Sequence, residues 1–117
     1  YRERALQGTG VAPRFPLWGQ PTAALAREMI DAGARAIVCC LDPRACPASL
    51  LGARFDHALL DALPPGVDPC AERGEFHTFA TDGPAFRHPL AVRRGPAVIR
   101  DGFHFLDLEL ADVALTA

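Results

Sequence analysis

A short polar stretch carries the side chains best suited to chemistry. Within residues 68–78, the carboxylates of Glu72 and Glu75 are followed by the imidazole of His77. A carboxylate beside an imidazole can hold a metal ion, move a proton or orient an amine. Gly74 lets the backbone approach a ligand or adopt a positive φ. The stretch is a candidate catalytic site, and the alternative is a solvated loop that enters an amphipathic strand.

Glu75 and His77 are two residues apart, so a strand would place both side chains on one face. The cysteines offer a second kind of site. A zinc site would draw on Cys40, Cys46, Cys70 and His77, yet no two of these cysteines have the C-x-x-C spacing typical of zinc proteins. We therefore expect buried thiols in a reducing compartment, without disulfides.

The composition excludes several function classes. All 12 basic residues are arginine, so the chain has no lysine nucleophile, Schiff-base lysine or Walker-type phosphate lysine. The net charge of −2 does not favour nucleic acid or an anionic membrane as a partner. No apolar run reaches the roughly 18 residues that cross a bilayer. The chain starts at Tyr1 and its one methionine is Met29, so we expect a piece of a longer protein.

The elements that would position the polar stretch indicate an α/β protein of the α+β type. Two main helices are predicted, at 21–32 and 55–63, the first with Pro21 as its first helical residue and Gly33 after its end. The strands are predicted at 36–41, 74–80, 90–92, 97–100 and 103–110. Asp101-Gly102 predicts a tight turn. This order indicates a small mixed or largely antiparallel sheet, with helices on one face and a C-terminal β-hairpin.

Five stretches, in their order and spacing, resemble the diphthine–ammonia ligase (diphthamide synthase) family. They are F-P-L-W-G at 15–19, R-E-M-I-D-A-G at 27–33, L-G-A-R-F-D at 51–56, C-A-E-R-G-E-F-H-T-F at 70–79 and D-G-P-A-F at 82–86. The family patterns are P-L-W-G, E-M-I-x-x-G, G-R-x-[IF]-D, G-E-G-G-E-[YF]-E-T and D-G-P-x-F. The resemblance covers nearly the whole chain, and the stretch at 70–79 is its most specific part.

The resemblance implies the C-terminal part of a PP-loop ATP pyrophosphatase. Residues 1–20 would be a linker from a missing N-terminal ATP-binding domain, which would bind ATP and Mg²⁺ through a Ser-Gly-Gly-Lys-Asp-Ser loop. Residues 21–117 would form the substrate-side domain. Such enzymes adenylate a carboxylate, release pyrophosphate and let ammonia displace AMP, and their best-known acceptor is diphthine on elongation factor two. The resemblance also implies a cytoplasmic ligase that binds neither nucleic acid nor membrane, and it leaves a homodimer open.

The resemblance also assigns site residues, because most of them occupy motif positions. The expected catalytic residues are Glu72, Glu75 and His77. The expected substrate-binding residues are Trp18, Gly19, Arg54, Gly74 and Thr78. No metal ligand is expected. Arg54 stands where G-R-x-[IF]-D has its arginine, although Ala53 interrupts that motif.

The chain departs from the acidic motif in three places. Ala71 and Arg73 replace glycines, which restricts the loop backbone, and His77 replaces a glutamate with a titratable group. These changes indicate a bacterial sub-branch whose acceptor is open. The leading hypothesis is the acceptor-side domain of an ATP-dependent amide-forming ligase, inactive on its own. Two alternatives stay open, a non-catalytic packing module and a metal-dependent hydrolase that uses residues 70–78. An isolated acceptor-side domain would expose apolar surface, so we expect self-association or marginal stability.

Overall fold

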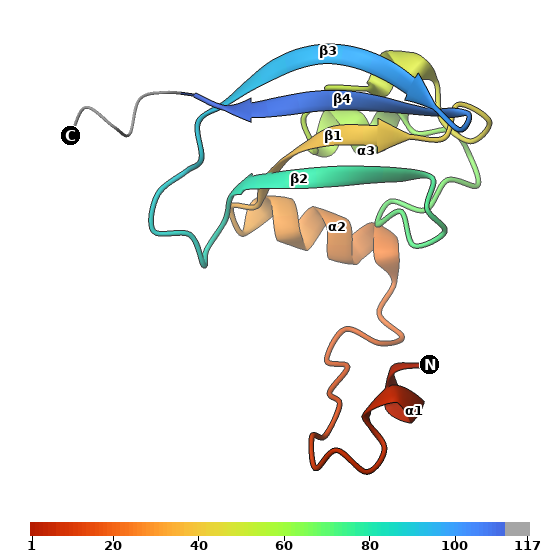
Figure 1. The fold of residues 1–117 in the computed structure, drawn as a ribbon, viewed down its shortest axis with the longest axis vertical. Coiled ribbons are helices and arrows are strands. Elements are labelled where there is room, and N and C mark those ends of the chain that lie inside the picture. The colour runs from red at the N-terminus through yellow and green to blue at the C-terminus, as the bar shows by residue number, and fades with distance from the viewer. Residues whose placement is uncertain (112–117) are drawn as a thin grey trace.

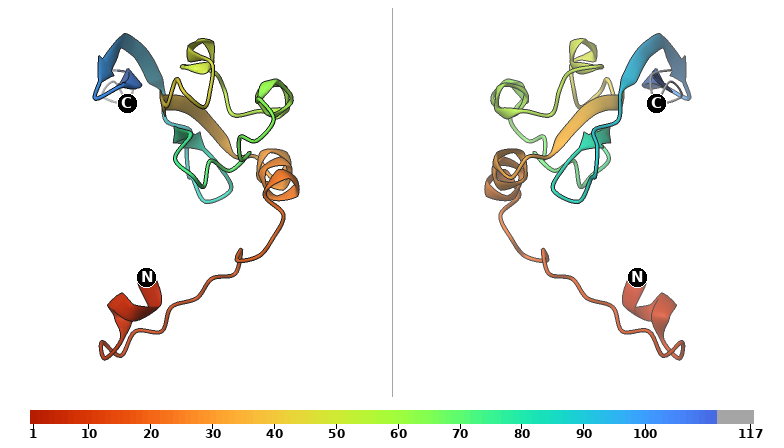
Figure 2. Two further views of the ribbon diagram at one scale, coloured as in Figure 1. Left: turned by 90° about the vertical axis from the view of Figure 1, so that its right-hand side faces the viewer. Right: turned by 90° about the vertical axis from the view of Figure 1, so that its left-hand side faces the viewer.

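The computed structural model describes residues 1–111. Four strands form one antiparallel sheet in the order β2-β1-β4-β3 (Figure 1). The elements in chain order are α1 (Arg2–Leu6), α2 (Thr22–Asp31), β1 (Arg35–Leu41), a 3₁₀ turn η1 (Ala48–Leu50), α3 (His57–Ala62), β2 (Phe76–Asp82), β3 (Val92–Arg100) and β4 (Phe103–Leu110). Helices α2 and α3 lie on one face of the sheet, and no described helix covers the other face (Figure 2). The predicted α+β class with two main helices and a C-terminal hairpin is confirmed.

The predicted helices form, but their boundaries differ from the prediction by one or two residues. Pro21 has an extended backbone, with φ −60° and ψ 123°, and precedes α2 as its N-cap rather than being its first helical residue. Helix α3 begins at His57, because the Asp56 side chain accepts a hydrogen bond from the Leu59 N–H at 2.9 Å. An aspartate in this role satisfies a backbone donor that the first helical turn leaves free.

The C-terminal hairpin differs from the prediction in one respect. Of the strand predicted at 90–92 only Val92 is in a strand, and from there β3 runs on through the strand predicted at 97–100, with an irregularity between Arg94 and Ala97. A Cβ on Gly95 would lie 3.2 Å from the carbonyl oxygen of Asp107, so the chains approach closely here. The predicted turn is confirmed, since Asp101 and Gly102 have φ values of 51° and 82°, as a two-residue hairpin loop of type I′ requires.

The hydrophobic core lies between the sheet and α3. Leu41 is fully buried and pairs with Phe76 of β2 on one side and with His104 of β4 on the other. Leu59 of α3 closes the core from the helical face. The core cluster consists of Val38, Leu41, Cys46, Leu59 and Phe76. All four cysteines are free thiols, and Cys40 and Cys46 are buried.

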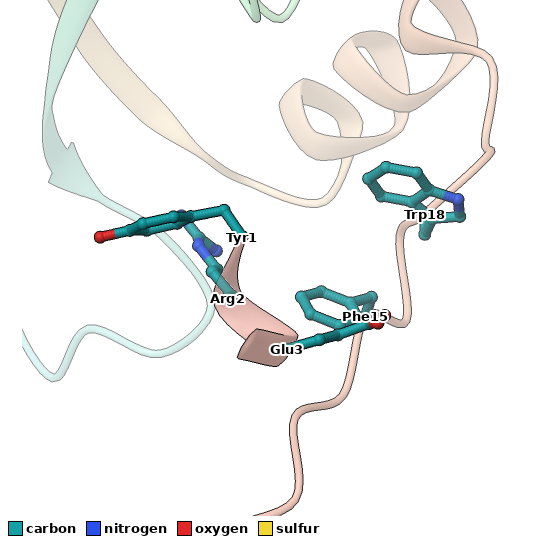
Figure 3. Close-up of a pocket in the computed structure, with 5 residues that line it drawn as sticks. All are labelled: Tyr1, Arg2, Glu3, Phe15 and Trp18. Atoms are coloured by element: carbon teal, nitrogen blue, oxygen red, sulfur yellow. The ribbon is translucent and has the colours of Figure 1, made fainter. Parts of the chain in front are cut away.

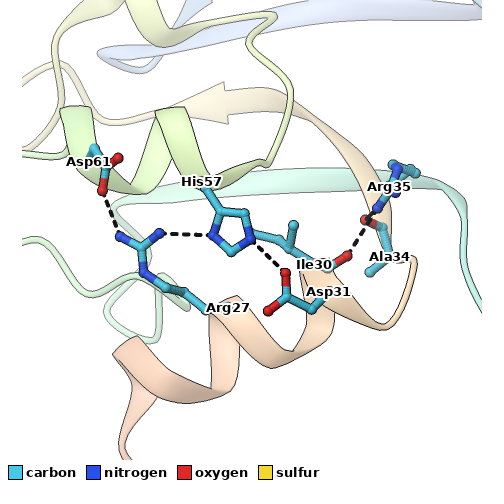
Figure 4. Close-up of polar contacts among 7 residues, drawn as sticks. All are labelled: Arg27, Ile30, Asp31, Ala34, Arg35, His57 and Asp61. Carbon is cyan, nitrogen blue, oxygen red and sulfur yellow. Dashed lines mark hydrogen bonds and ion pairs between the residues drawn. The ribbon is translucent and has the colours of Figure 1, made fainter.

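A polar network joins α2 to α3 (Figure 4). Arg27 contacts His57 Nδ1 at 2.8 Å and Asp61 Oδ1 at 2.7 Å, and His57 Nε2 lies 2.8 Å from Asp31 Oδ1. Because a guanidinium can only donate, Nδ1 accepts and Nε2 carries the hydrogen that reaches Asp31. His57 is therefore the centre of the contact between the two helices.

Replacing His57 with alanine lowers the free energy of unfolding by about 1 kcal/mol, because the network is half-exposed and such contacts are individually weak. For a chain of this size we expect the melting temperature to fall by about 4 °C. The matched control is Asp61→Ala, which removes only one ion pair at the end of the network and should cost less. Thermal melts of both variants test this, and an equal or smaller effect for His57→Ala would contradict it.

The first 20 residues form an N-terminal arm that extends away from the sheet (Figures 1 and 2). The arm holds α1 and exposes large apolar side chains, among them Trp18 at 86% exposure. Its assignment as a linker, and that of residues 21–117 as a substrate-side domain, stay predictions, and residues 112–117 of that range lie outside the described residues. None of the helices within residues 1–111 has the length and apolar character to cross a membrane.

Candidate functional site

The acidic loop, residues 68–75, is organised around the side chain of Glu75. This side chain is only 7% exposed. Its Oε2 accepts a hydrogen bond from the Asp68 N–H at 2.6 Å, and its Oε1 accepts one from the Arg73 N–H at 2.9 Å. The Glu75 carbonyl oxygen accepts from the N–H of Asp42 at 2.9 Å, which ties the end of the loop to the residue that follows β1. The loop is therefore closed around a buried carboxylate.

Electrostatics keep this carboxylate ionised. Burial by itself would raise the pKa of Glu75, but the N–H groups of Asp68, Glu75 and Arg73 favour the charged form and together lower the pKa below its ordinary value. At neutral pH Glu75 is an anion whose two oxygens are occupied by backbone donors. The prediction that Glu75 and His77 share a strand face does not describe this arrangement, because β2 begins at Phe76 and the Glu75 side chain belongs to the loop.

The loop backbone uses left-handed conformations at Ala71, with φ 53°, and at Gly74, with φ 76°. An alanine in this region costs about 1 kcal/mol relative to glycine, and Ala71 packs against the core cluster in return. Arg73, the other residue that replaces a family glycine, is not among the residues with positive φ. The replacement of a family glycine by Arg73 therefore adds no backbone strain to the loop, whereas the replacement by Ala71 does add strain.

Cys70 fastens the acidic loop to the start of α2. Its thiol donates to the Thr22 carbonyl oxygen, with 3.5 Å between sulfur and oxygen. Burial raises the pKa of the Cys70 thiol, and the nearby carboxylates of Asp68 and Glu72 raise it further. A protonated thiol is a poor nucleophile and a poor metal ligand, so Cys70 acts here as a structural contact.

An open groove of about 400 Å³ runs between α2 and β2, and we call it the α2–β2 groove. His77 and Thr78 border it and both are exposed. Because they are neighbours on β2, their side chains point to opposite faces, and His77 also lines a second recess with Cys40, Phe103 and Phe105. Cys70 and Ala71 of the acidic loop close one part of it, and Met29 contributes from α2. Glu72 is exposed on the same loop. The acidic loop thus lies beside a strand whose successive residues, His77 and Thr78, point to opposite faces of the sheet.

Arg54 lies in a neighbouring cavity of about 550 Å³, whose charged lining consists of three arginines, at positions 35, 54 and 94, and two carboxylates, Asp56 and Asp82. Its backbone bridges Ile37 of β1, and its side chain is exposed. Arg94 donates to the Gly52 carbonyl oxygen at 3.0 and 3.2 Å. This cavity shares Arg35, Ala36 and Phe55 with the α2–β2 groove, so the two recesses adjoin.

Trp18 and Gly19 lie on the N-terminal arm, away from both recesses. Trp18 lines a cavity of about 600 Å³ together with Phe15 and the first three residues (Figure 3). The rings of Phe15 and Trp18 meet edge to face with centroids 6.4 Å apart. No residue of the acidic loop lines this cavity. The residues expected to form one site therefore fall in three places, namely the groove, the arginine-lined cavity and the arm.

The metal site of the hydrolase alternative would use residues 70–78. Across residues 1–111, no three or more histidine, cysteine, aspartate or glutamate side chains gather closely enough to hold a metal ion. Glu75, which the hydrolase alternative uses as a ligand, accepts hydrogen bonds from the loop backbone instead. The described residues do not fit that alternative.

Sequence reasoning missed Asp68 as a residue that shapes the site. Its N–H binds Glu75, and its Oδ1 accepts from the Cys70 N–H at 2.9 Å. An aspartate that bonds the backbone two residues ahead forms a turn of its own. The Asp68-Pro69 dipeptide was the available signal, since aspartate before proline favours the start of a turn.

The comparison with protein families matches residues 21–110 to the diphthamide synthase C-terminal domain. The matched range includes every element from α2 to β4, the acidic loop and the α2–β2 groove. The search of the curated proteins gave no match to this chain. Because the family match covers well over half of the residues, the chain belongs to the diphthamide synthase C-terminal domain family.

Proposed function

We propose that this chain is the acceptor-side domain of an ATP-dependent ligase that forms an amide through an acyl-adenylate. Family membership over residues 21–110 carries the proposal. In this reaction an acceptor carboxylate attacks the α-phosphate of ATP and pyrophosphate leaves. Ammonia then attacks the acyl carbon, the carbon–oxygen bond to AMP breaks, and the nitrogen loses a proton. The reaction takes place in the cytoplasm, and the resemblance implies diphthine or an equivalent bacterial carboxylate as the acceptor.

The α2–β2 groove is the part of the chain that we assign to the second step. His77 borders the groove at the β2 edge and is the group that we assign to accept the proton that the attacking nitrogen loses. The Thr78 hydroxyl, which points to the opposite face of β2 from His77, can hydrogen-bond the acceptor. Glu72 is an exposed carboxylate that can attract ammonium to the groove. Glu75 acts on this step through the loop that it holds, so it is a positioning residue.

Arg54 supplies a different kind of contact. An arginine can bind a carboxylate or phosphate through paired N–H groups, and Arg54 shares its cavity with Arg35 and Arg94. We assign this cavity to an anionic group of the acceptor or of AMP. Trp18 and Gly19 lie on the arm, so a role for them in substrate binding requires the ATP-binding domain to bring them near.

ATP and Mg²⁺ belong, in this proposal, to the preceding ATP-binding domain. The chain contains no lysine, and its described residues hold no set of metal ligands. We therefore assign to the present residues only the binding of the acceptor and ammonia and the movement of a proton.

The proposal predicts a Ser-Gly-Gly-Lys-Asp-Ser loop in the reading frame before Tyr1, within about 120 residues, the length of one domain. A protein that includes that loop should release pyrophosphate with a carboxylate acceptor and yield an amide when ammonia is added. Its matched control replaces the loop lysine with alanine, which should abolish pyrophosphate release. A reading frame without the loop, or pyrophosphate release that never yields an amide, would contradict the proposal.

The second candidate is a packing module with no part in the chemistry. The exposed apolar side chains of the arm favour it, since such surfaces mark contacts with other protein. Among them Tyr1 is 99% exposed, Val11 58% and Leu17 53%. On this alternative, substitutions in the groove leave amide formation unchanged, and the His77 variant described in the Discussion separates the two candidates.

A further inference from the structure

The two edges of the sheet differ in how they are protected. The β3 edge carries arginines at positions 93, 94 and 100, and its irregularity contains Pro96, which has no N–H to donate. The β2 edge has neither proline nor a charged residue before Asp82. Charges, proline and bulges are the devices that prevent an edge from pairing with another strand. The β1–β2 ladder is irregular between Arg35 and Ala36 and between Val38 and Cys40, but it is regular in between, so residues 78–80 of β2 are left open to such pairing.

The backbone of Thr78 points outward from that edge. Val38 of β1 lies opposite Thr78. The Val38 N–H donates to the Ala53 carbonyl oxygen and its own carbonyl accepts from the Gly52 N–H, so both groups point away from β2. In an antiparallel pair, opposite residues either both bond across the pair or both point away from it. The N–H and C=O of Thr78 therefore point away from β1, into the space beside the sheet.

The backbone of Ala80 points outward for the same reason. Its partner Ala36 accepts a hydrogen bond from the Phe55 N–H on the far side of β1. The open stretch of the β2 edge, residues 78–80, ends on both sides. Before it Phe76 is buried, and after it the Thr81 carbonyl accepts from the Leu90 N–H at 2.7 Å. Thr78 and Ala80 are both exposed, and within residues 1–111 their backbone groups have no hydrogen-bond partner on the outer side.

We propose that β2 pairs in antiparallel fashion with β2 of a second copy of this chain, about a two-fold axis beside Phe79. Thr78 then lies opposite the partner's Ala80, and Ala80 lies opposite the partner's Thr78. Each copy contributes two N–H and two C=O groups, so the pairing makes four hydrogen bonds. The two sheets become one continuous sheet, and the outward-pointing N–H and C=O groups of Thr78 and Ala80 are all hydrogen-bonded.

The side chains favour this register. Phe79 lies opposite Ile37, on the sheet face that no described helix covers, and it is 39% exposed. At the axis it meets the partner's Phe79 as a pair that lacks mutual backbone bonds, where side chains approach most closely. No like charges face each other across the axis, because residues 76–81 carry no acidic or arginine side chain.

Each end of the strand carries side chains of both charge signs, so each end can pair with the other end of a second copy. An antiparallel pairing places the loop before β2 of one copy beside the last residue of β2 and the segment after it in the other. The first carries the exposed carboxylate of Glu72 and the exposed guanidinium of Arg73, and the second carries the half-buried carboxylate of Asp82 and the exposed guanidinium of Arg87. Since the pairing is two-fold, the contact occurs at both ends. An uncharged, self-complementary edge whose two ends each offer a carboxylate and a guanidinium fits a second copy of this chain better than an unrelated strand.

Sedimentation equilibrium of the 117-residue chain tests the proposal, and we expect a species of twice the 12.5 kDa monomer mass. Thr78→Pro removes an outward N–H without taking a bond from the β1–β2 ladder, since proline is tolerated on edge strands in this orientation. We expect it to raise the dimer dissociation constant by about 100-fold, because two of the hydrogen bonds are lost at once. The matched control Thr78→Val keeps the N–H and should leave the dimer intact.

A second variant keeps the test decisive if Thr78→Pro fails to fold. Phe79→Arg retains every backbone group but sets two guanidinium groups against each other at the axis, so it should also yield monomers. In the wild-type chain, hydrogen exchange at the Thr78 and Ala80 amides should slow as the concentration rises. The proposal is overturned by a wild-type chain that stays monomeric at high concentration, by a dimer that survives Phe79→Arg, or by an edge that pairs only with an added peptide.

Discussion

Glu75→Gln lowers the free energy of unfolding by about 2 to 3 kcal/mol. The glutamine amide keeps one acceptor oxygen, but its NH₂ group faces a backbone N–H that the carboxylate had bound, so one hydrogen bond to a charged group is lost and a buried donor is left without a partner. The donors are the N–H groups of Asp68 and Arg73, at 2.6 and 2.9 Å. We expect the melting temperature to fall by about 10 °C, as measured by thermal or urea unfolding.

The effect of this substitution depends on pH in a defined direction. The folded state holds the pKa of Glu75 below its ordinary value of 4.5. A group with a lowered pKa stabilises the folded state fully above the unfolded pKa, and this contribution is lost as pH falls through the folded pKa. The difference in stability between the wild type and Glu75→Gln should therefore be constant from neutral pH down to about pH 5 and shrink below it.

Glu72→Gln is the matched control, because it makes the same change on the same loop at an exposed side chain. It should alter stability by less than about 0.5 kcal/mol. Equal effects of the two substitutions, or a wild-type advantage over Glu75→Gln that grows as the pH falls, would contradict the structural role of Glu75. A loss of activity in Glu75→Gln therefore reports on catalysis only in a sample shown to be folded.

Glycines and turn dipeptides in the sequence predicted where an element ends when the residues at that end decide it. Gly33 after α2 and the Asp101-Gly102 turn each impose a backbone conformation on their own segment, so both were found from the sequence. Gly95-Pro96 shows the limit of such signals, because the same dipeptide that breaks a short strand is accommodated in β3 as an irregularity. Only the neighbouring strand β4 decides between the two outcomes.

The candidate site depends on contacts that the sequence could not supply. Strand alternation predicted that Glu75 would share a face with His77, but backbone donors within the acidic loop decide where its carboxylate lies. His57 contacts Arg27, 30 residues earlier, and no periodicity encodes a pair between two helices. Motif order likewise gave no sign that Arg54 and Trp18 would lie in separate cavities.

His77→Gln separates the two steps of the proposed reaction. Adenylation takes place at the ATP-binding domain, so pyrophosphate release in the two-domain protein should persist. The amide-forming step needs a group to accept the proton of the attacking nitrogen, and such groups contribute about 10²- to 10⁴-fold to a rate. We expect amide formation to fall by about 100-fold, the lower end of that range, because water and the exposed Glu72 also lie near the groove.

The matched control is His88→Gln, the same substitution at an exposed histidine that does not line the α2–β2 groove. It should change neither step. Since His77 is exposed on the edge strand, the substitution should leave the melting temperature close to that of the wild type, so a loss of amide cannot be attributed to unfolding. Unchanged amide formation would remove His77 from the mechanism and favour the packing module. An equal loss of pyrophosphate and amide in a folded variant would move His77 to the adenylation step.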